Sequence, residues 1–385
     1  MVSKTDNFFF ANSIEDIQQK DWNGCVGLDH PFTRYEFLAA LEKSKSAINE
    51  TGWQPFHYFQ MNNQKKIEVV CPLYIKSHSY GEYIFDHAWA EAYHRYGLEY
   101  YPKIQSAIPF TPVTSERIIV HKNIKDKNTF KIKAAQNIIN KANSINVSSV
   151  HFNFIKEPLF INHNLNKNLL LRQGIQFHWK NKNYKSFNDF LKTLSSRKRK
   201  LIKKERSCLE KNNLKIELLT GNEIKKYHWD FFYRCYLNTT EKKWGASYLT
   251  KDFFIEIGRN LSSKILLIVA IEENQMIASA LNFFSKTHLY GRLWGSLKNI
   301  PYLHFELCYY QAIEYAIKNN IKIVEAGAQG MHKIQRGYLP EKTWSLHWIK
   351  NDKFKEAIGQ FLDQEINLLN KEKKDLEEFT PFKNI

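Results

Sequence analysis

Residues 288–295 combine charged, aromatic and glycine residues in an alternating order. In a strand, successive side chains point to opposite faces. One face would therefore carry His288, Tyr290, Arg292 and Trp294. The other would carry Leu289, Gly291, Leu293 and Gly295, and glycines allow a ligand to approach the backbone closely. We predict that this strand lines a substrate cleft. The alternative is a half-buried strand whose polar face lies in water.

A second group follows in the stretch EAGAQGMHKIQRGYLP, residues 325–340. Glu325 would share a strand face with Ile321 and Ile323, so its carboxylate should lie inside, where it needs a partner or has a raised pKa. The glycine-containing loop after it carries Gln329, His332, Lys333 and Arg336. Cations in such a loop suit a phosphate or a developing oxyanion. Alternatively, Glu325 and Arg336 form a structural ion pair beneath the loop.

His304 and Glu306 open a predicted helix over residues 304–320. At about 100° per residue they lie on opposite sides of a regular helix, so they cannot both face one cleft unless the first turn is unwound. The predicted core stripe is Phe305, Tyr309, Ala312, Ile313, Ala316 and Ile317. Glu306 then lies at the border of the stripe, as a base or an amine ligand. His304 is a substrate-binding candidate or a hydrogen-bonding residue of the helix start.

Two carboxylates occur in the aromatic segment HSYGEYIFD, residues 78–86. Read as a strand, it places Glu82 and Asp86 on one face and Tyr83 with Phe85 on the other. Carboxylates flanked by aromatic rings could bind an amine acceptor. The alternative is an acidic edge in water.

Seven basic residues occur within SSRKRKLIKKERS, residues 195–207. The apolar stripe beneath them consists of Leu194, Leu201, Ile202 and Cys208. That stripe indicates a docked amphipathic helix rather than a free tail. The candidates for binding RNA or coenzyme phosphates, or an anionic membrane face, are Arg197, Lys198, Arg199 and Lys200. A solvated basic face is the alternative.

Other chemistries have no sequence support. There is no HExxH motif, no CxxC pair and no Ser/His/Asp spacing of a catalytic triad, so we predict neither a metal site nor a covalent nucleophile. The five cysteines without CxxC pairs favour a reducing compartment. With no signal peptide and no apolar run long enough to span a membrane, we expect a soluble, cytoplasmic protein.

The elements that position these residues fall into two blocks, which we predict as domains over residues 1–170 and 171–385. The second reads strand, two helices, three strands, helix, strand; it follows a basic helix over 187–212 and ends in a charged helix. The first block has a weaker version of the same order. This order predicts an α/β fold whose mixed sheet has a cleft where the strand order changes.

The chain is strongly basic. It has 56 Lys and Arg against 39 Asp and Glu, a formal net charge of +17. Such a surface attracts phosphates of nucleotide cofactors, RNA or a membrane. The alternative is compositional, because the chain is rich in Lys, Asn and Ile and the excess lysines would then scatter over solvated surfaces.

Several of these segments together carry a resemblance. HPFTRYEFLAALEKS, SSRKRKLIKKER, LHFELCYYQAIE and EAGAQGMHKIQRGYLP look like the bacterial FemAB-like N-acyltransferases of the peptidoglycan biosynthesis/recognition group. The resemblance implies tandem GNAT-like units, the second with a catalytic-type cleft, and direct transfer of an acyl or aminoacyl group to an amine. HKxxRG at 332–337 resembles the FKxxFG segment of Fem transferases, which implies a place for Lys333 near the donor carbonyl or phosphates.

Two departures from related patterns leave the donor open. The acetyl-CoA loop (Q/R)xxGx(G/A) is missing between residues 295 and 304, and the coiled-coil arm of some Fem enzymes is absent. The activated donor, a co-substrate rather than a permanently bound cofactor, is therefore acyl-CoA, acyl-carrier protein or aminoacyl-tRNA. The acceptor is a small-molecule or lipid-linked amine, and peripheral membrane contact is compatible with the basic helix. The other hypothesis is a non-catalytic module that binds a cell-wall precursor or RNA.

Overall fold

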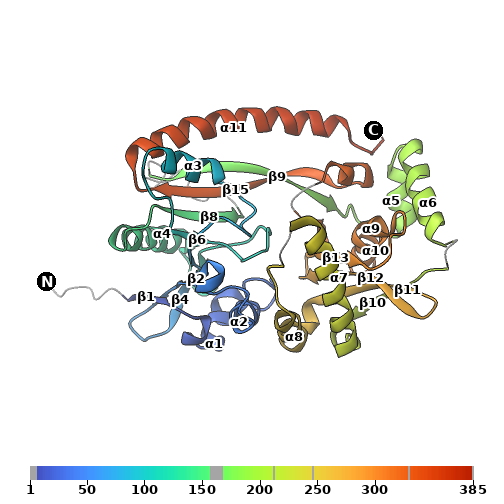
Figure 1. Cartoon of the computed structure of the whole chain (residues 1–385), viewed down its shortest axis with the longest axis horizontal. Helices are drawn as coiled ribbons and strands as arrows, with labels where there is room; N and C mark the ends of the chain where they lie inside the picture. Colours follow the sequence, from blue (N-terminus) through green and yellow to red (C-terminus); the bar gives the residue numbers. More distant parts are fainter. Residues whose placement is uncertain (1–6, 157–167, 211–212, 245–246, 328–329, 384–385) are drawn as a thin grey trace. The chain divides into compact units, whose positions relative to one another are not determined.

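The computed structural model describes residues 7–156, 168–210, 213–244, 247–327 and 330–383, and it divides the chain into two compact units (Figure 1). Unit 1 consists of residues up to 174 together with 343–369, and unit 2 of 175–342 together with 370–385. Residues 343–369 thus group with the first unit, whereas the sequence-based division assigned them to the second. The reason is that the second half of strand β15 (Leu339–Ile349) pairs with strand β8 (Ser149–Ile155).

Unit 1 contains two sheets. The smaller has the antiparallel order β1-β3-β4-β7, and the other runs β8-β6-β5-β2, with β6 and β8 parallel. The strands are β1 (Phe8–Ala11), β2 (Trp53–Pro55), β3 (His57–Met61), β4 (Ile67–Cys71), β5 (Tyr74–Lys76), β6 (Lys103–Ser106), β7 (Ile119–Val120) and β8. The helices are α1 (Gln19–Val26), α2 (Tyr35–Lys43), α3 (His87–Arg95), α4 (Lys127–Ser144) and the first part of α11 (Asp352–Glu378).

Unit 2 contains one sheet of order β10-β11-β12-β13-β14-β9, in which only β13 and β14 run parallel. Its strands are β9 (Leu170–Lys180), β10 (Lys215–Thr220), β11 (Ile265–Glu272), β12 (Gln275–Phe284), β13 (His288–Ser296) and β14 (Ile323–Glu325). Its helices are α5 (Phe187–Thr193), α6 (Ser196–Glu210), α7 (Lys226–Trp244), α8 (Lys251–Asn260), α9 (Leu303–Phe305), a π-helical turn (Glu306–Tyr310), α10 (Gln311–Lys318) and the 3-10 helix η7 (Met331–Arg336). From β10 to β14 this is the predicted order of elements.

The two faces of the unit 2 sheet are covered by different helices. The predicted stripe of the crossover helix is confirmed: Ala312, Ile313 and Ala316 are fully buried against residues such as Leu289 of β13. On the other face, Gly295 lies against α7, because a Cβ built there would be only 2.0 Å from the carbonyl oxygen of Cys235. Helices therefore cover both faces of this sheet.

Two predicted elements differ from the structure. The helix expected over 187–212 is two helices, α5 and α6, because Leu194 adopts an extended conformation with ψ of 152° between them. The segment 78–86 is not a strand; it is an irregular connection that contains Tyr83 with a left-handed φ of 60°. The alternation of faces assumed for Glu82 and Asp86 does not apply there.

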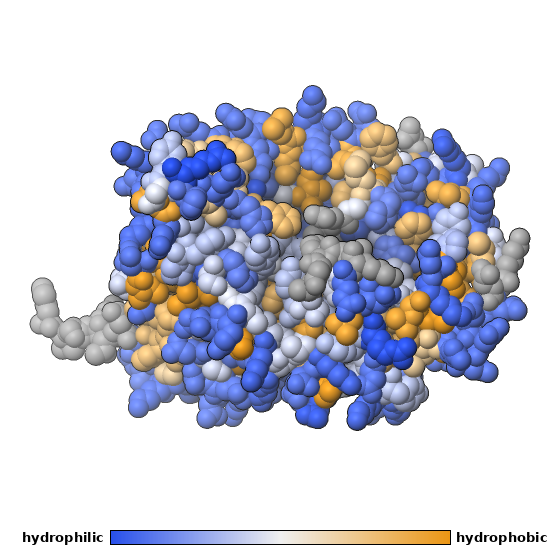
Figure 2. Space-filling view, viewed as in Figure 1, coloured by the Kyte–Doolittle hydropathy of each residue, from blue (hydrophilic) through white to orange (hydrophobic). Residues whose placement is uncertain are grey.

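The surface agrees with the charged composition. Hydrophilic residues cover most of the face visible in Figure 2, with apolar residues scattered among them. Within the described ranges, no helix has both the length and the apolar character needed to cross a bilayer.

Candidate functional site

Glu325 ends strand β14 inside unit 2. Its residue is 4% exposed, and its carboxylate oxygen Oε2 is buried without a hydrogen-bond partner in the described part of the chain. Its other oxygen, Oε1, lies 3.9 Å from Nε2 of His288. Burial raises the pKa of Glu325 to about 8, and the charge of Arg292 offsets part of this rise. A carboxyl group with this pKa can exchange a proton near neutral pH.

The strand beside it, β13, does not have the predicted single polar face. A β-bulge falls at Arg292, because Leu281 pairs with Leu293 while the next residue of β12, Asn282, pairs with Gly291. His288 and Tyr290 therefore share the face of Glu325, and their rings stack at 5.5 Å. Trp294 is moved to the opposite face, where it packs in the core beside α10. The prediction that all four side chains form one wall is wrong, because the strand was assumed to be regular.

Lys333 in η7 is only 2% exposed. Its Nζ donates a hydrogen bond to the carbonyl oxygen of Gly327, at 3.0 Å. Burial lowers the pKa of Lys333 to about 8. His178 of β9 pairs with Glu325 in the sheet. Its pKa is lowered to about 3, first by burial and then by the charges of His288, Lys180 and Lys333. The end of β14 thus gathers Glu325, Lys333 and two imidazoles, and the sequence pattern gave no signal for His178.

An aromatic cluster surrounds Trp294, on the face of β13 opposite Glu325. His304 of α9 contacts Trp294 at 4.7 Å and Tyr309 at 5.3 Å between ring centroids. The Tyr309 hydroxyl lies 2.9 Å from Nε2 of His332, whose ring is 6.1 Å from that of His304. The structure thus brings the predicted His304, His332 and Trp294 together. Gln329, also predicted as substrate-binding, lies outside the described residues.

Glu306 is engaged elsewhere. Its carboxylate accepts from Nε and Nη2 of Arg206 in α6, at 3.1 and 2.8 Å, and from Gln311 at 2.7 Å. Arg206 also pairs with Glu314 at 2.8 Å. Donors of the chain itself thus occupy both oxygens of this carboxylate. The helix is irregular at this point, because a π-helical turn begins at Glu306. Even so, Glu306 and His304 contact different neighbours.

Arg336 does not pair with Glu325, which was the structural alternative considered from the sequence. Its Nη2 donates to Glu205 of α6 at 2.7 Å and its Nε to the hydroxyl of Tyr310 at 3.0 Å. A third bond goes to the carbonyl of His332, and the guanidinium lies 3.4 Å from the Phe305 ring centroid. Arg336 therefore fixes η7, which carries Lys333, onto α6.

The basic helix α6 is docked by its inner side and basic on its outer side. Of the predicted stripe, Leu194 and Ile202 are fully buried, whereas Leu201 and Cys208 are half-buried; Glu205, which was not predicted, is 3% exposed. Arg197 and Lys200 are exposed, whereas Lys198 and Arg199 are half-buried. Arg199 makes one weak contact to Ser196, at 3.4 Å. These four cations could accompany a polyanion along the helix.

Glu82 and Asp86 lie in unit 1, buried around a lysine of the same unit. Nζ of Lys103 donates to Glu82 at 2.8 Å and also to Asp86. Burial would lower the pKa of Lys103, but the two carboxylates outweigh it and raise that pKa. Lys76 lies 3.9 Å from Glu82, and burial lowers its pKa to about 7. The amine held by these carboxylates is thus part of the chain itself.

The mixed α/β topology, with its parallel pair β13 and β14, is that of the acetyltransferase-like fold class. The chain belongs to the FemAB-like family, described as peptidoglycan biosynthesis/recognition, whose model matches residues 13–384. A comparison with curated protein sequences gave no match.

Solved structures show the same fold. FemX is 11% identical, with a TM-score of 0.52 and coverage of 89% of this chain and 98% of FemX. The C-terminal domain of a putative lysylphosphatidylglycerol synthetase from Agrobacterium fabrum is 8% identical, with a TM-score of 0.54 and coverages of 89% and 96%. A protein called L-PGS from Bacillus licheniformis is 9% identical, with a TM-score of 0.50 and coverages of 82% and 91%. The predicted mixed α/β fold of the Fem type is confirmed. Family and fold support a peptidoglycan-related acyl or aminoacyl transferase.

Proposed function

We propose that this chain transfers an acyl or aminoacyl group from a phosphate-bearing activated donor to an amine, at the end of β14 in unit 2. The observation that carries the proposal is the buried carboxyl of Glu325, with a pKa raised to about 8 and one oxygen without a partner in the described part of the chain. A base for an amine needs such a pKa and a free lone pair. Glu306 lacks the second, because Arg206 and Gln311 occupy it.

The proposed step is a direct attack without a covalent enzyme intermediate. The amine nitrogen forms a bond to the donor carbonyl carbon, and the ester or thioester bond to the carrier breaks. Glu325 accepts the amine proton and passes it to the oxygen or sulfur of the carrier, which leaves as an alcohol or a thiol. Lys333 and Arg292 stabilise the oxyanion of the tetrahedral intermediate, because both are cations next to Glu325 or its loop.

The other side chains bind rather than react. His304 and His332 contact the part of the substrate that reaches the aromatic cluster around Trp294, on the other face of β13 from Glu325. His288 and Tyr290 hold the opposite side of Glu325. The outer cations of α6, Arg197 to Lys200, accompany the donor phosphates.

The donor follows from the charge of the site. Cations on η7, β13 and α6 favour a carrier with phosphates, which acyl-CoA, acyl-carrier protein and aminoacyl-tRNA all provide. The acceptor is a small-molecule or lipid-linked amine. It must arrive unprotonated, because an ammonium has no lone pair with which to attack.

Native mass spectrometry of the purified chain with each of the three donors identifies the one that is retained. Turnover with that donor and a panel of amines then tests the site. We expect Glu325→Gln to lower kcat about 100- to 1000-fold, and Lys333→Ala to lower it further. Glu256→Gln, which removes a half-buried carboxylate paired with the exposed Arg259 in the same unit, is the control and should be neutral. Full turnover by the double variant Glu325→Gln, Lys333→Ala would falsify the assignment. If the parent chain retains a donor but transfers its group to none of the amines, the chain is a binding module instead.

A further inference from the structure

The crossover helix of unit 2 contains one extra residue near its start. In the π-helical turn Glu306–Tyr310, between α9 and α10, the backbone N–H of Gln311 donates to the carbonyl oxygen of Glu306, five residues earlier. An α-helix bonds residues four apart, so the turn shifts the phase of the helix by one residue, or about 100°. Such turns are rare, and we expect specific side-chain contacts to hold this one open.

The carboxylate of Glu306 bridges the turn. Nε2 of Gln311 donates to Oε1 of Glu306 at 2.7 Å. On a regular helix, residues three or four apart are neighbours, whereas residues five apart point about 140° away from each other. With one residue inserted, residues 306 and 311 lie as close in phase as residues four apart. Their side-chain bond therefore favours the π-turn over a regular turn.

Arg206 of α6 fits the same phase. Its guanidinium donates to Glu306 through Nε and Nη2, at 3.1 and 2.8 Å, and to Glu314 through Nη1 and Nη2, at 2.8 and 3.1 Å. Residues eight apart lie about 80° apart on a regular helix, but about 20° apart when one residue is inserted between them. One planar guanidinium can then bind both carboxylates. The side chain of Glu306 is only 5% exposed, so water competes little for these bonds.

The turn contains two tyrosines that contact the 3-10 helix η7. The Tyr309 hydroxyl lies 2.9 Å from Nε2 of His332, and the Tyr310 hydroxyl accepts from Nε of Arg336 at 3.0 Å. His332 and Arg336 lie on either side of Lys333 in the sequence of η7. The orientation of the turn therefore determines whether η7 is held on both sides of Lys333.

The residues before the turn depend on it as well. α10 is fixed in the core, because Ala312 and Ile313 are fully buried. Closing the turn would therefore rotate α9 by about 100° about the helix axis. Phe305 would lose the Arg336 guanidinium, which lies 3.4 Å from its ring centroid, and His304 would leave the aromatic cluster.

We infer that Glu306 is a positioning residue of the transferase site. Through Gln311 and Arg206 it holds the π-turn open, and the turn keeps η7 and Lys333 in place. The inference rests on the proposed function, in which Lys333 stabilises the oxyanion. Glu306 then acts through the backbone and not on a proton, so a neutral side chain that makes the same bonds can replace it.

Glu306→Gln and Glu306→Ala distinguish this role from that of a base. A carboxamide at position 306 can still accept from Arg206 and pair with the carboxamide of Gln311, whereas a methyl group can do neither. Hydrogen–deuterium exchange of the full chain is followed by mass spectrometry of its peptides. We expect residues 331–337 to exchange about tenfold faster in Glu306→Ala and within about twofold of the parent in Glu306→Gln.

Turnover should follow the same order. We expect kcat to fall about tenfold in Glu306→Ala and to stay within about threefold of the parent in Glu306→Gln. In Glu306→Ala the falling limb of the pH profile of kcat/KM should also move to higher pH, because a less buried Lys333 has a pKa nearer its ordinary value. A loss of stability alone would not move this limb.

Gln311→Ala removes only the bond across the turn and leaves the ion pair intact, so it serves as a second test if Glu306→Ala does not fold. Residues 331–337 should exchange about threefold faster in this variant. Its control is Gln136→Ala, which removes a 2.8 Å bond to Asn140, four residues further along the regular helix α4. The control should leave exchange at 331–337 unchanged.

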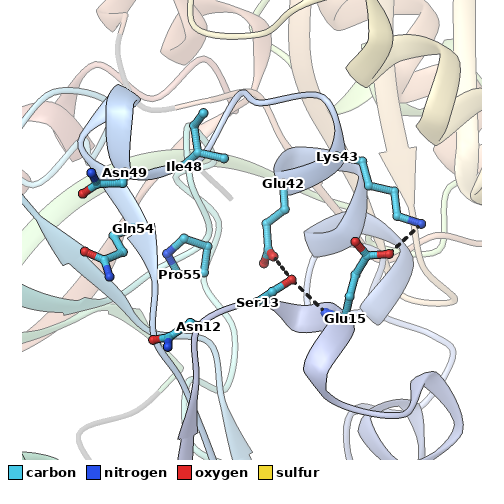
Figure 3. A pocket seen from close by; sticks show the side chains of 9 residues that line it. All are labelled: Asn12, Ser13, Glu15, Glu42, Lys43, Ile48, Asn49, Gln54 and Pro55. Carbon is cyan, nitrogen blue, oxygen red and sulfur yellow. Dashed lines mark hydrogen bonds and ion pairs between the residues drawn. The ribbon is translucent and has the colours of Figure 1, made fainter.

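Glu42→Ala controls for the loss of a buried carboxylate as such. Glu42 lines a hollow of unit 1 (Figure 3), where its carboxylate accepts from Ser13 Oγ and from the Ile14 backbone N–H, at 2.8 and 2.9 Å. Its side chain is 7% exposed, against 5% for that of Glu306. The midpoint of thermal unfolding should fall in both alanine variants, but only Glu306→Ala should change exchange at 331–337.

The inference is overturned if Glu306→Gln loses as much turnover as Glu306→Ala, because the carboxylate then acts on a proton. It is also overturned if residues 331–337 exchange as in the parent in both Glu306→Ala and Gln311→Ala. Exchange does not require a donor, so it tests the hold on η7 independently of turnover. Faster exchange together with the turnover of the parent would instead contradict the role of Lys333 in the proposed function.

Discussion

At the scale of single residues, the candidate site pairs two groups whose pKa values move toward each other. Burial raises the pKa of Glu325 to about 8 and lowers that of Lys333 to about 8. Near this pH each is partly in the form that the proposed step requires, a carboxylate and an ammonium. Neither shift needs a specific partner, because desolvation is the first cause of both.

The first prediction concerns the pH dependence of kcat/KM with the retained donor. The rate should rise with pH as Glu325 loses its proton and fall above pH 8 as Lys333 loses its own, which gives a bell with its maximum near pH 8. Glu325→Gln should abolish the rising limb that belongs to the pKa near 8 and keep the falling one. The acceptor amine adds a rise at its own pKa, which the variant keeps. A rising limb unchanged in midpoint in this variant would mean that another group accepts the proton.

The second prediction concerns stability. Lys333 has a folded-state pKa of about 8, below its ordinary value of 10.5, so its burial as a cation destabilises the fold below pH 8 and this cost disappears as pH rises toward 10.5. Lys333→Met should therefore raise the free energy of unfolding at pH 7, and the gain should vanish by about pH 10.5. Urea unfolding at both pH values measures it. A variant less stable than the parent at pH 7 would show that the hydrogen bond to Gly327 outweighs desolvation.

How much of the site can be predicted from sequence depends on the residue. The period of two correctly places Glu325 inside and His288 beside Tyr290, because β14 and the start of β13 are regular. It misplaces Trp294, because an extra residue in a strand leaves no mark in the pattern of polar and apolar side chains. The period of two also cannot predict ion pairs. Arg336 binds Glu205, which is 131 positions away in the sequence, and not Glu325.

At the scale of elements, α6 and η7 are joined by buried charges. Glu205 and Arg336 are 3% and 4% exposed, and Tyr310 bridges them. The sequence predicts the docked face of α6 from its apolar residues, but not the acidic and basic residues through which it binds η7. The burial of one charged residue within a basic run cannot be predicted from its residue type, because it depends on a partner from a distant segment.

The third prediction tests this connection. Glu205→Gln leaves the Arg336 guanidinium buried without an ionised partner, which should lower the free energy of unfolding by about 3–5 kcal/mol. Glu256→Gln removes a comparable pair with Arg259, whose side chain is 68% exposed, and should cost less than about 1 kcal/mol. Equal losses in the two variants, measured by urea unfolding, would contradict a buried connection.

At the scale of the whole molecule, the charge of +17 favours polyanions without specifying one. The distribution of this positive charge determines whether α6 is a specific polyanion-binding helix or one of many basic surfaces. Arg197 and Lys200 are exposed on one helix, whereas other lysines are scattered over both units.

The fourth prediction separates these cases. Changing Arg197, Lys198, Arg199 and Lys200 to Gln should reduce the slope of log affinity for transfer RNA against log salt concentration by up to about three, since each contact contributes roughly 0.7 to 0.9. The control changes Lys122, Lys125, Lys127 and Lys133 of unit 1, which are all exposed, and removes the same charge. If both sets change the slope equally, the attraction is a property of net charge alone.

The division of each unit into two separate stretches of chain has a consequence for biosynthesis. Leu346 and Trp348 complete the apolar core around α4, although the rest of that core ends near residue 171. A ribosome must therefore add about 175 further residues, which takes roughly 10 to 35 s, before that core can close. During this interval the nascent first unit exposes apolar surface to chaperones and to other emerging chains, while the second is still being translated.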